Sequence, residues 1–93
     1  MTLPDPSPLA RHWGLDPEVV QLNHGSFGAA PLAVLARQRE LRDELEANPT
    51  GFFLRRFPEL LVEARSALGV FVGAEPGDLA LMPNATAGVN TAL

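Results

Sequence analysis

Residues 79–82, Leu-Ala-Leu-Met, form an uninterrupted apolar run between two turn-forming segments. Such a run is typical of a strand buried on both faces of a parallel or mixed sheet. A second short β-prone run lies at Val19 to Asn23. A single strand of four residues cannot form a sheet. The sequence therefore predicts an α/β protein in which this chain is mostly α-helix and contributes one or two short strands.

Two helices with apolar stripes precede the run. The pattern predicts one helix from about Pro31 to Ala47 and a second from Pro58 to Val72, ended by Gly73. Between them, Asn48 to Gly51 is expected to stop the first helix, and Phe52 to Phe57 to form an apolar connector. Because such helices expose their stripes without a covering layer, we expect the chain to be part of a longer protein or to rely on a partner.

Composition limits the class of protein further. A chain of 93 residues can bury one modest core. The net charge is -4 and the arginines are scattered, which argues against binding to nucleic acid or to an anionic membrane. There is no cysteine, so a disulfide, a zinc-thiolate site and a cysteine nucleophile are excluded within the chain.

The N-terminal residues lack the basic region and apolar core of a signal peptide, and no apolar run approaches membrane-spanning length. We therefore expect a cytoplasmic protein. The chain also contains no lysine, so chemistry that needs a lysine amine cannot be completed within it.

A polar turn comes after the apolar run and opens another helix, Asn84-Ala85-Thr86-Ala87-Gly88. The first N–H groups of a helix are unpaired and favour a negative charge. Ala85 allows close approach of a ligand to the backbone, and Thr86 offers an N-cap hydroxyl and an N–H. A phosphate site and a merely capped helix are both consistent with this pattern. A glycosylation sequon at Asn84 would need a secretory route, of which the sequence gives no sign.

Three segments in order resemble the N-terminal part of the class V aminotransferases, which are fold-type I pyridoxal-phosphate enzymes, and most of all their isopenicillin N epimerase-like branch. They are residues 21–31 (QLNHGSFGAAP), 59–81 (ELLVEARSALGVFVGAEPGDLAL) and 84–93 (NATAGVNTAL). The resemblance implies a large domain with a mainly parallel seven-stranded sheet, a smaller C-terminal domain and a homodimer with active sites at the subunit interface. We accordingly divide the chain into an N-terminal arm with an active-site loop, 1–30, and the incomplete start of the large domain, 31–93.

The resemblance also implies roles for single residues. In the family, the turn that matches Ala85 and Thr86 holds the phosphate of pyridoxal 5'-phosphate, in agreement with the anion preference of a helix N-terminus. The loop that matches Asn23 to Ser26 lies near the substrate, so His24 and Gly25 are predicted to be substrate neighbours. The alternative for His24 is a ring that only ties down the loop.

Arg55 and Arg56 are further candidates, because amino-acid substrates carry a carboxylate that a guanidinium binds with two hydrogen bonds. We predict that Arg55 binds the substrate, and one of the two arginines would reach across the dimer. The alternative is a solvated pair beside an apolar segment. No catalytic residue is predicted, because the family's catalytic lysine has no counterpart here. No metal ligand is predicted either.

The resemblance predicts a parent enzyme that removes the α-proton of an amino acid with the help of its cofactor. Epimerisation, transamination and loss of a β-substituent are the outcomes left open. One alternative is a carbon–sulfur lyase or cysteine desulfurase-like enzyme of the same superfamily. Another is a non-catalytic helical interaction module. The 93-residue chain alone is not expected to be active.

Overall fold

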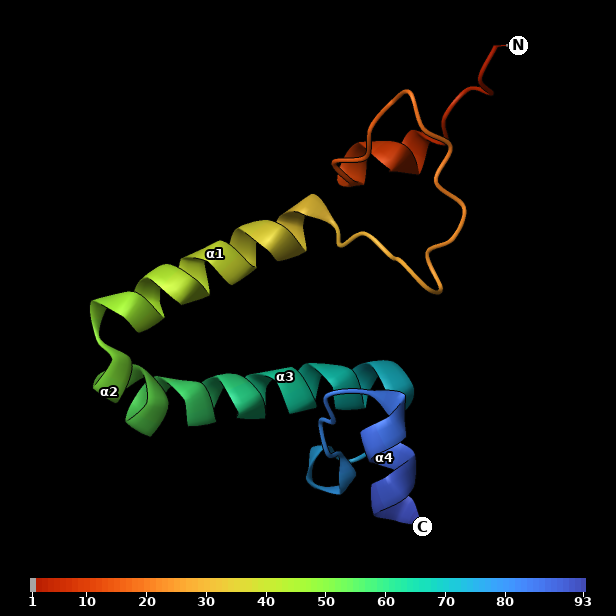
Figure 1. Ribbon diagram of the computed structural model, residues 1–93. Helices are drawn as coiled ribbons and strands as arrows, with labels where there is room; N and C mark the ends of the chain where they lie inside the picture. Colours follow the sequence, from red (N-terminus) through yellow and green to blue (C-terminus); the bar gives the residue numbers. More distant parts are fainter. Residues whose placement is uncertain (1) are drawn as a thin grey trace. The chain divides into compact units, whose positions relative to one another are not determined.

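The computed structural model describes residues 2–93, and helices dominate this part of the chain (Figure 1). The chain forms two compact units, one up to Ala47 and one from Asn48 onward. In chain order the elements are the 3₁₀ helix η1 (Pro8–His12), α1 (Leu32–Ala47), α2 (Pro49–Gly51), the π-helix η2 (Phe52–Arg56), α3 (Phe57–Val72), the 3₁₀ helix η3 (Pro76–Asp78) and α4 (Ala85–Ala92). The predicted domain division at residue 30 stays a prediction.

The first unit contains the arm, the loop and α1. The indole Nε1 of Trp13 donates a hydrogen bond to the Ala29 carbonyl at 3.2 Å, which ties the end of η1 to the segment before α1. The Pro31 carbonyl accepts the first helical hydrogen bond, from the Leu35 N–H at 3.1 Å. The predicted helix from about Pro31 to Ala47 is confirmed, whereas the role of residues 1–30 as an arm stays a prediction.

The second unit begins with a nearly continuous helical run. Asn48 does end α1, but it also caps α2, because its Oδ1 accepts a hydrogen bond from the Gly51 N–H at 3.0 Å. The prediction of a connector at Phe52 to Phe57 is wrong, since the backbone there is helical.

The π-turn of η2 has a physical cause in Pro58. Proline has no N–H to donate to the Leu54 carbonyl, and its ring would press on that group in a regular α-helix. The N–H of the preceding residue, Phe57, bonds to the Phe52 carbonyl, five residues back, rather than to the Phe53 carbonyl, four residues back, which widens the turn. The rings of Phe52, Phe53 and Phe57 then lie together, with centroids 5.6 to 6.4 Å apart.

The helix α3 ends as predicted at Gly73, which has a left-handed φ of 71°. The Gly73 N–H bonds to the Gly69 carbonyl at 2.9 Å. A Cβ at Gly69 would lie 2.7 Å from the Ala74 carbonyl oxygen, so this glycine lets the chain turn back closely against α3. The next element, η3, packs on α3.

The predicted short strands are wrong for residues 2–93, none of which is in a strand. Leu79 has extended dihedral angles, φ −103° and ψ 128°, so the 79–82 run begins with the extended backbone that its residues favour. A strand also needs ladder hydrogen bonds with a neighbour, and neither this run nor Val19 to Asn23 has one in the described chain. The mostly helical content is confirmed, whereas the sheet of the whole protein remains a prediction.

Candidate functional site

The start of α4 is the predicted phosphate site. Asn84 is the N-cap: its Oδ1 accepts a hydrogen bond from the Ala87 N–H at 2.8 Å, and its carbonyl accepts one from the Gly88 N–H at 3.1 Å. The interpretation of Thr86 as the cap is therefore wrong, because Thr86 lies inside the first turn. Sequence reasoning missed Asn84, although asparagine is among the strongest N-cap residues.

The cap leaves a compact group of donors at Ala85 and Thr86. Both residues are exposed, and within residues 2–93 neither of their N–H groups nor the Thr86 hydroxyl has a hydrogen-bond partner. A Cβ added at Gly88 would meet only Met82 Cγ, at 3.9 Å, so this side of the turn is open. Three donors beside small side chains fit the oxygens of a phosphate group.

The loop that carries His24 and Gly25 is built by its neighbours. Asn23 caps it twice: its Oδ1 accepts from the Ser26 N–H at 3.3 Å, and its carbonyl accepts from the Phe27 N–H at 3.0 Å. Gln21 Nε2 donates to the Phe27 carbonyl at 3.0 Å. These bonds hold the turn without using the His24 ring.

The His24 side chain is therefore available for contacts beyond the loop. Within the described chain its ring makes no hydrogen bond, and it lines a cavity of about 1030 Å³ in the first unit. The wall of this cavity is mostly apolar and includes Leu15, Val20 and Leu22. The interpretation of His24 as a ring that ties down the loop finds no support in these contacts.

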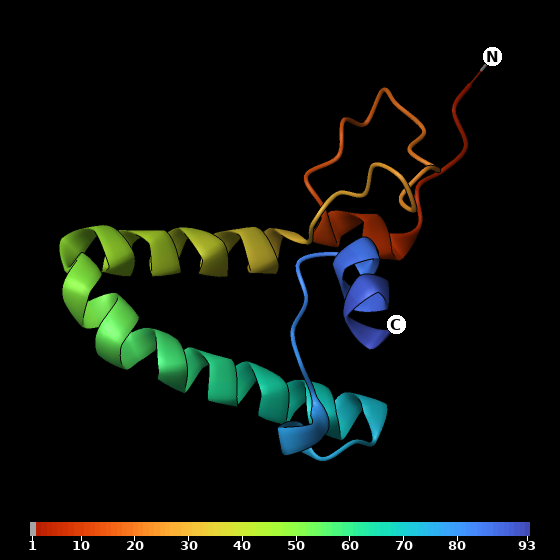
Figure 2. The same cartoon turned by 60° about the horizontal axis from the view of Figure 1, so that its bottom comes forward.

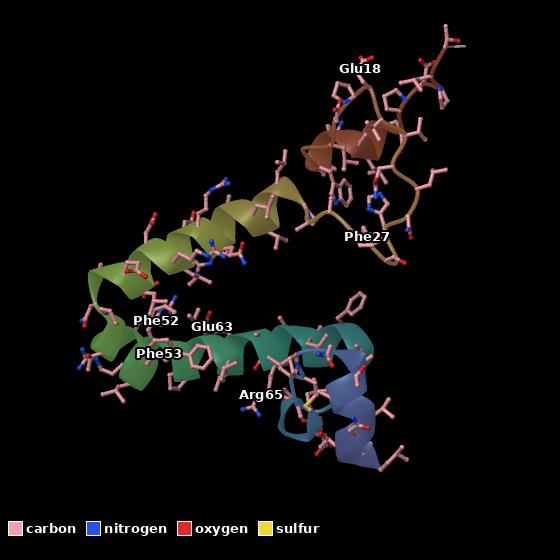
Figure 3. All side chains as sticks on the ribbon, viewed as in Figure 1. Glu18, Phe27, Phe52, Phe53, Glu63 and Arg65 are labelled. Atoms are coloured by element: carbon pink, nitrogen blue, oxygen red, sulfur yellow. The ribbon has the colours of Figure 1, made fainter. Side chains whose placement is uncertain are left out.

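Arg55 and Arg56 differ sharply in their surroundings. Arg56 Nη1 lies 3.5 Å from Glu59 Oε2 and 3.6 Å from Oε1 of Glu63, which is labelled on α3 in Figure 3. Arg55 is exposed and forms no ion pair with a carboxylate of residues 2–93. The arginine selected from the sequence is thus the one whose charge is not already balanced by neighbours.

Within the second unit, η2, which carries Arg55, and the start of α4 lie toward opposite ends of α3 in both views (Figures 1 and 2). A helix of 16 residues is about 24 Å long. Arg55 and Thr86 are thus separated along the length of α3 within one chain. His24 and Gly25 belong to the first unit.

Metal-binding clusters and membrane-spanning helices are both absent from the described part of the chain. No group of three or more His, Asp or Glu side chains is placed to hold a metal ion among residues 2–93. None of the helices described there has the length and apolar character needed to cross a membrane.

Most of this chain is similar in sequence to known proteins. It is 46% identical to isopenicillin N epimerase from Streptomyces clavuligerus over 76 residues, which are 82% of the chain and 19% of that protein. It is 28% identical to hercynylcysteine sulfoxide lyase from Schizosaccharomyces pombe, over 91% of the chain and 22% of the relative. It is 31% identical to a protein from Arabidopsis thaliana named probable L-cysteine desulfhydrase, chloroplastic, over 76% of the chain and 15% of the relative.

The chain thus spans about a fifth of the length of the curated relatives it matches. No family model matches it. All three relatives are named as enzymes, but one name is that of an epimerase and two are those of lyase-type enzymes. The similarity therefore supports one enzyme family without selecting a branch.

Proposed function

We propose that these residues belong to a pyridoxal-phosphate-dependent enzyme of the class V aminotransferase family that acts on an amino acid, as an epimerase or aminotransferase-like enzyme. The observation that carries the proposal is the start of α4, where the Ala85 and Thr86 N–H groups and the Thr86 hydroxyl have no partner in the described chain. The similarity to an epimerase and to two lyase-type enzymes supports it.

In this proposal, Ala85 and Thr86 bind the cofactor phosphate. Their N–H groups and the hydroxyl donate to its oxygens, while Asn84 keeps the first turn in place through the Ala87 N–H. When bound, pyridoxal phosphate withdraws electrons from the α-carbon of the amino acid. The contribution of this part of the chain is to anchor and orient that group.

The substrate contacts come from His24, Gly25 and Arg55. Arg55 binds the substrate carboxylate through its planar guanidinium. Because α3 separates Arg55 from Thr86, the proposal requires a homodimer in which Arg55 acts in the site of the second copy. His24 and Gly25, held by the loop around Asn23, contact the substrate itself.

A carbon–sulfur lyase is the second candidate, because two relatives are named a sulfoxide lyase and a probable desulfhydrase. The two candidates differ in the step after the α-proton is removed. A lyase expels a sulfur leaving group from the β-carbon, whereas an epimerase returns a proton to the α-carbon from the opposite face. The residues of this chain serve either outcome equally.

The full-length protein tests the proposal directly. We expect purified protein to take up pyridoxal 5'-phosphate and to develop a visible absorbance band. With L-cysteine in deuterated buffer, sulfide and pyruvate release would identify a lyase, and deuterium at the α-carbon without release would identify an epimerase or aminotransferase. If no absorbance band stays with the protein after saturation and removal of free cofactor, the proposal is refuted.

A further inference from the structure

Gly51 is a glycine whose backbone does not require one. It lies at the junction of α2 and η2 with φ −63° and ψ −38°, which are ordinary right-handed helical angles. Glycine inside a helix is less favourable than alanine, because it loses more conformational freedom on folding. The reason for glycine at this position must therefore be space rather than conformation.

Two polar side chains occupy that space. A Cβ at Gly51 would lie 2.8 Å from Asn48 Cγ and 3.0 Å from Arg55 Nη2. It would also collide with Asn48 Nδ2. The Asn48 amide and the Arg55 guanidinium thus both border the space that a Cβ of Gly51 would occupy.

The Asn48 Nδ2 group and the Arg55 guanidinium are both hydrogen-bond donors. The Asn48 Oδ1 is engaged by the Gly51 N–H at 3.0 Å, which fixes the orientation of the amide and leaves Nδ2 as its outer group. Arg55 can only donate. Within residues 2–93 neither Nδ2 nor the Arg55 guanidinium has an acceptor. Neighbouring donors without an acceptor between them are complementary to an anion with two oxygens.

We propose that Asn48 and Arg55 form one carboxylate-binding pair and that Gly51 positions both by leaving its face open. The inference rests on the proposed function and deepens it, because it names a second donor for the substrate carboxylate and a positioning residue for Arg55. The guanidinium supplies the charge and a planar pair of N–H groups, and the amide supplies a further N–H. Lysine in place of Arg55 would keep the charge but lose the planar geometry.

Calorimetric titration of the full-length protein tests this pair. The probes are L-alanine and ethylamine, which has the same amine without the carboxylate. A hydrogen bond to a charged group contributes about 1.5–3 kcal/mol, or roughly ten- to a hundredfold in Kd. We expect Gly51→Ala, Asn48→Asp and Arg55→Lys each to raise the Kd of L-alanine at least about tenfold and that of ethylamine less than about twofold.

The variants are chosen to keep the fold. In Asn48→Asp the new carboxylate would still cap the Gly51 N–H, so the thermal midpoint should not fall. In Gly51→Ala the added Cβ displaces the Asn48 side chain while alanine favours the helix, so the thermal midpoint should change little. Gly77→Ala is the matched control, because a Cβ there meets nothing within 4 Å. It should leave both Kd values unchanged.

The proposal that Asn48 and Arg55 bind a carboxylate would be overturned if the substitutions raised the Kd of L-alanine and of ethylamine equally. It would also be overturned if the wild type bound L-alanine no more tightly than ethylamine. Calorimetry detects the amino acid whether or not the cofactor is bound. Uptake of pyridoxal 5'-phosphate, measured by absorbance on the same samples, reports separately on the proposed function.

Discussion

Gly25 and Gly28 both lie in the His24 loop, but the surroundings of the two residues differ. A Cβ at Gly28 would lie 2.6 Å from the His24 carbonyl oxygen, a backbone atom that cannot move alone. A Cβ at Gly25 would meet nothing within 4 Å, and its φ is not positive. Gly28 is therefore needed to form the loop, whereas the space at Gly25 is available to a ligand.

This contrast gives a matched pair of substitutions in the full-length protein. Gly28→Ala should lower the free energy of unfolding by about 1–3 kcal/mol, because the added methyl group forces the backbone apart. Gly25→Ala should leave stability unchanged and raise the Kd for the amino-acid substrate if Gly25 is its neighbour. Chemical denaturation and calorimetry measure the two effects, and an unchanged unfolding free energy in Gly28→Ala would contradict the loop geometry.

At the scale of single residues, some contacts can be predicted from the sequence and others cannot. Glu59 and Glu63 lie three and seven residues after Arg56, so helical spacing predicts the pairing of Arg56 rather than Arg55 once the segment is known to be helical. The space at Gly51 cannot be predicted in this way, because it depends on where two side chains lie against the backbone.

At the scale of elements, the helices were predictable and their junctions were not. Periodic leucines and the Gly73 stop predict α1 and α3 nearly to the residue. The π-helix η2 escapes prediction because it arises from Pro58 acting on the preceding turn rather than from a composition of its own. The 79–82 run predicts a strand because its residues favour extended backbone. The hydrogen bonds that make it a strand depend on other segments.

At the scale of the whole molecule, large apolar side chains remain exposed. Val70 and Phe71 at the end of α3 are each 87% exposed, and Phe27, labelled in Figure 3, is 80% exposed. Phe52 is the one buried apolar side chain among residues 2–93. One buried ring contributes far less free energy than the ordering of so many residues costs.

We therefore expect the 93-residue chain, expressed alone at micromolar concentration, to show no cooperative thermal transition by circular dichroism. It should also bind a hydrophobic dye, because its apolar surface is open. A sharp, reversible transition would instead favour the non-catalytic helical module.

The cofactor site is tested most directly by separating the phosphate from the rest of pyridoxal phosphate. In the full-length protein, Thr86→Val should raise the Kd of pyridoxal 5'-phosphate about tenfold or more, through loss of a hydrogen bond to a charged group, and leave the Kd of pyridoxal unchanged. Thr91→Val is the control, because the Thr91 hydroxyl bonds to the Ala87 carbonyl at 2.8 Å within α4. Equal weakening of both ligands by Thr86→Val, or no weakening of either, would contradict a phosphate site at Ala85 and Thr86.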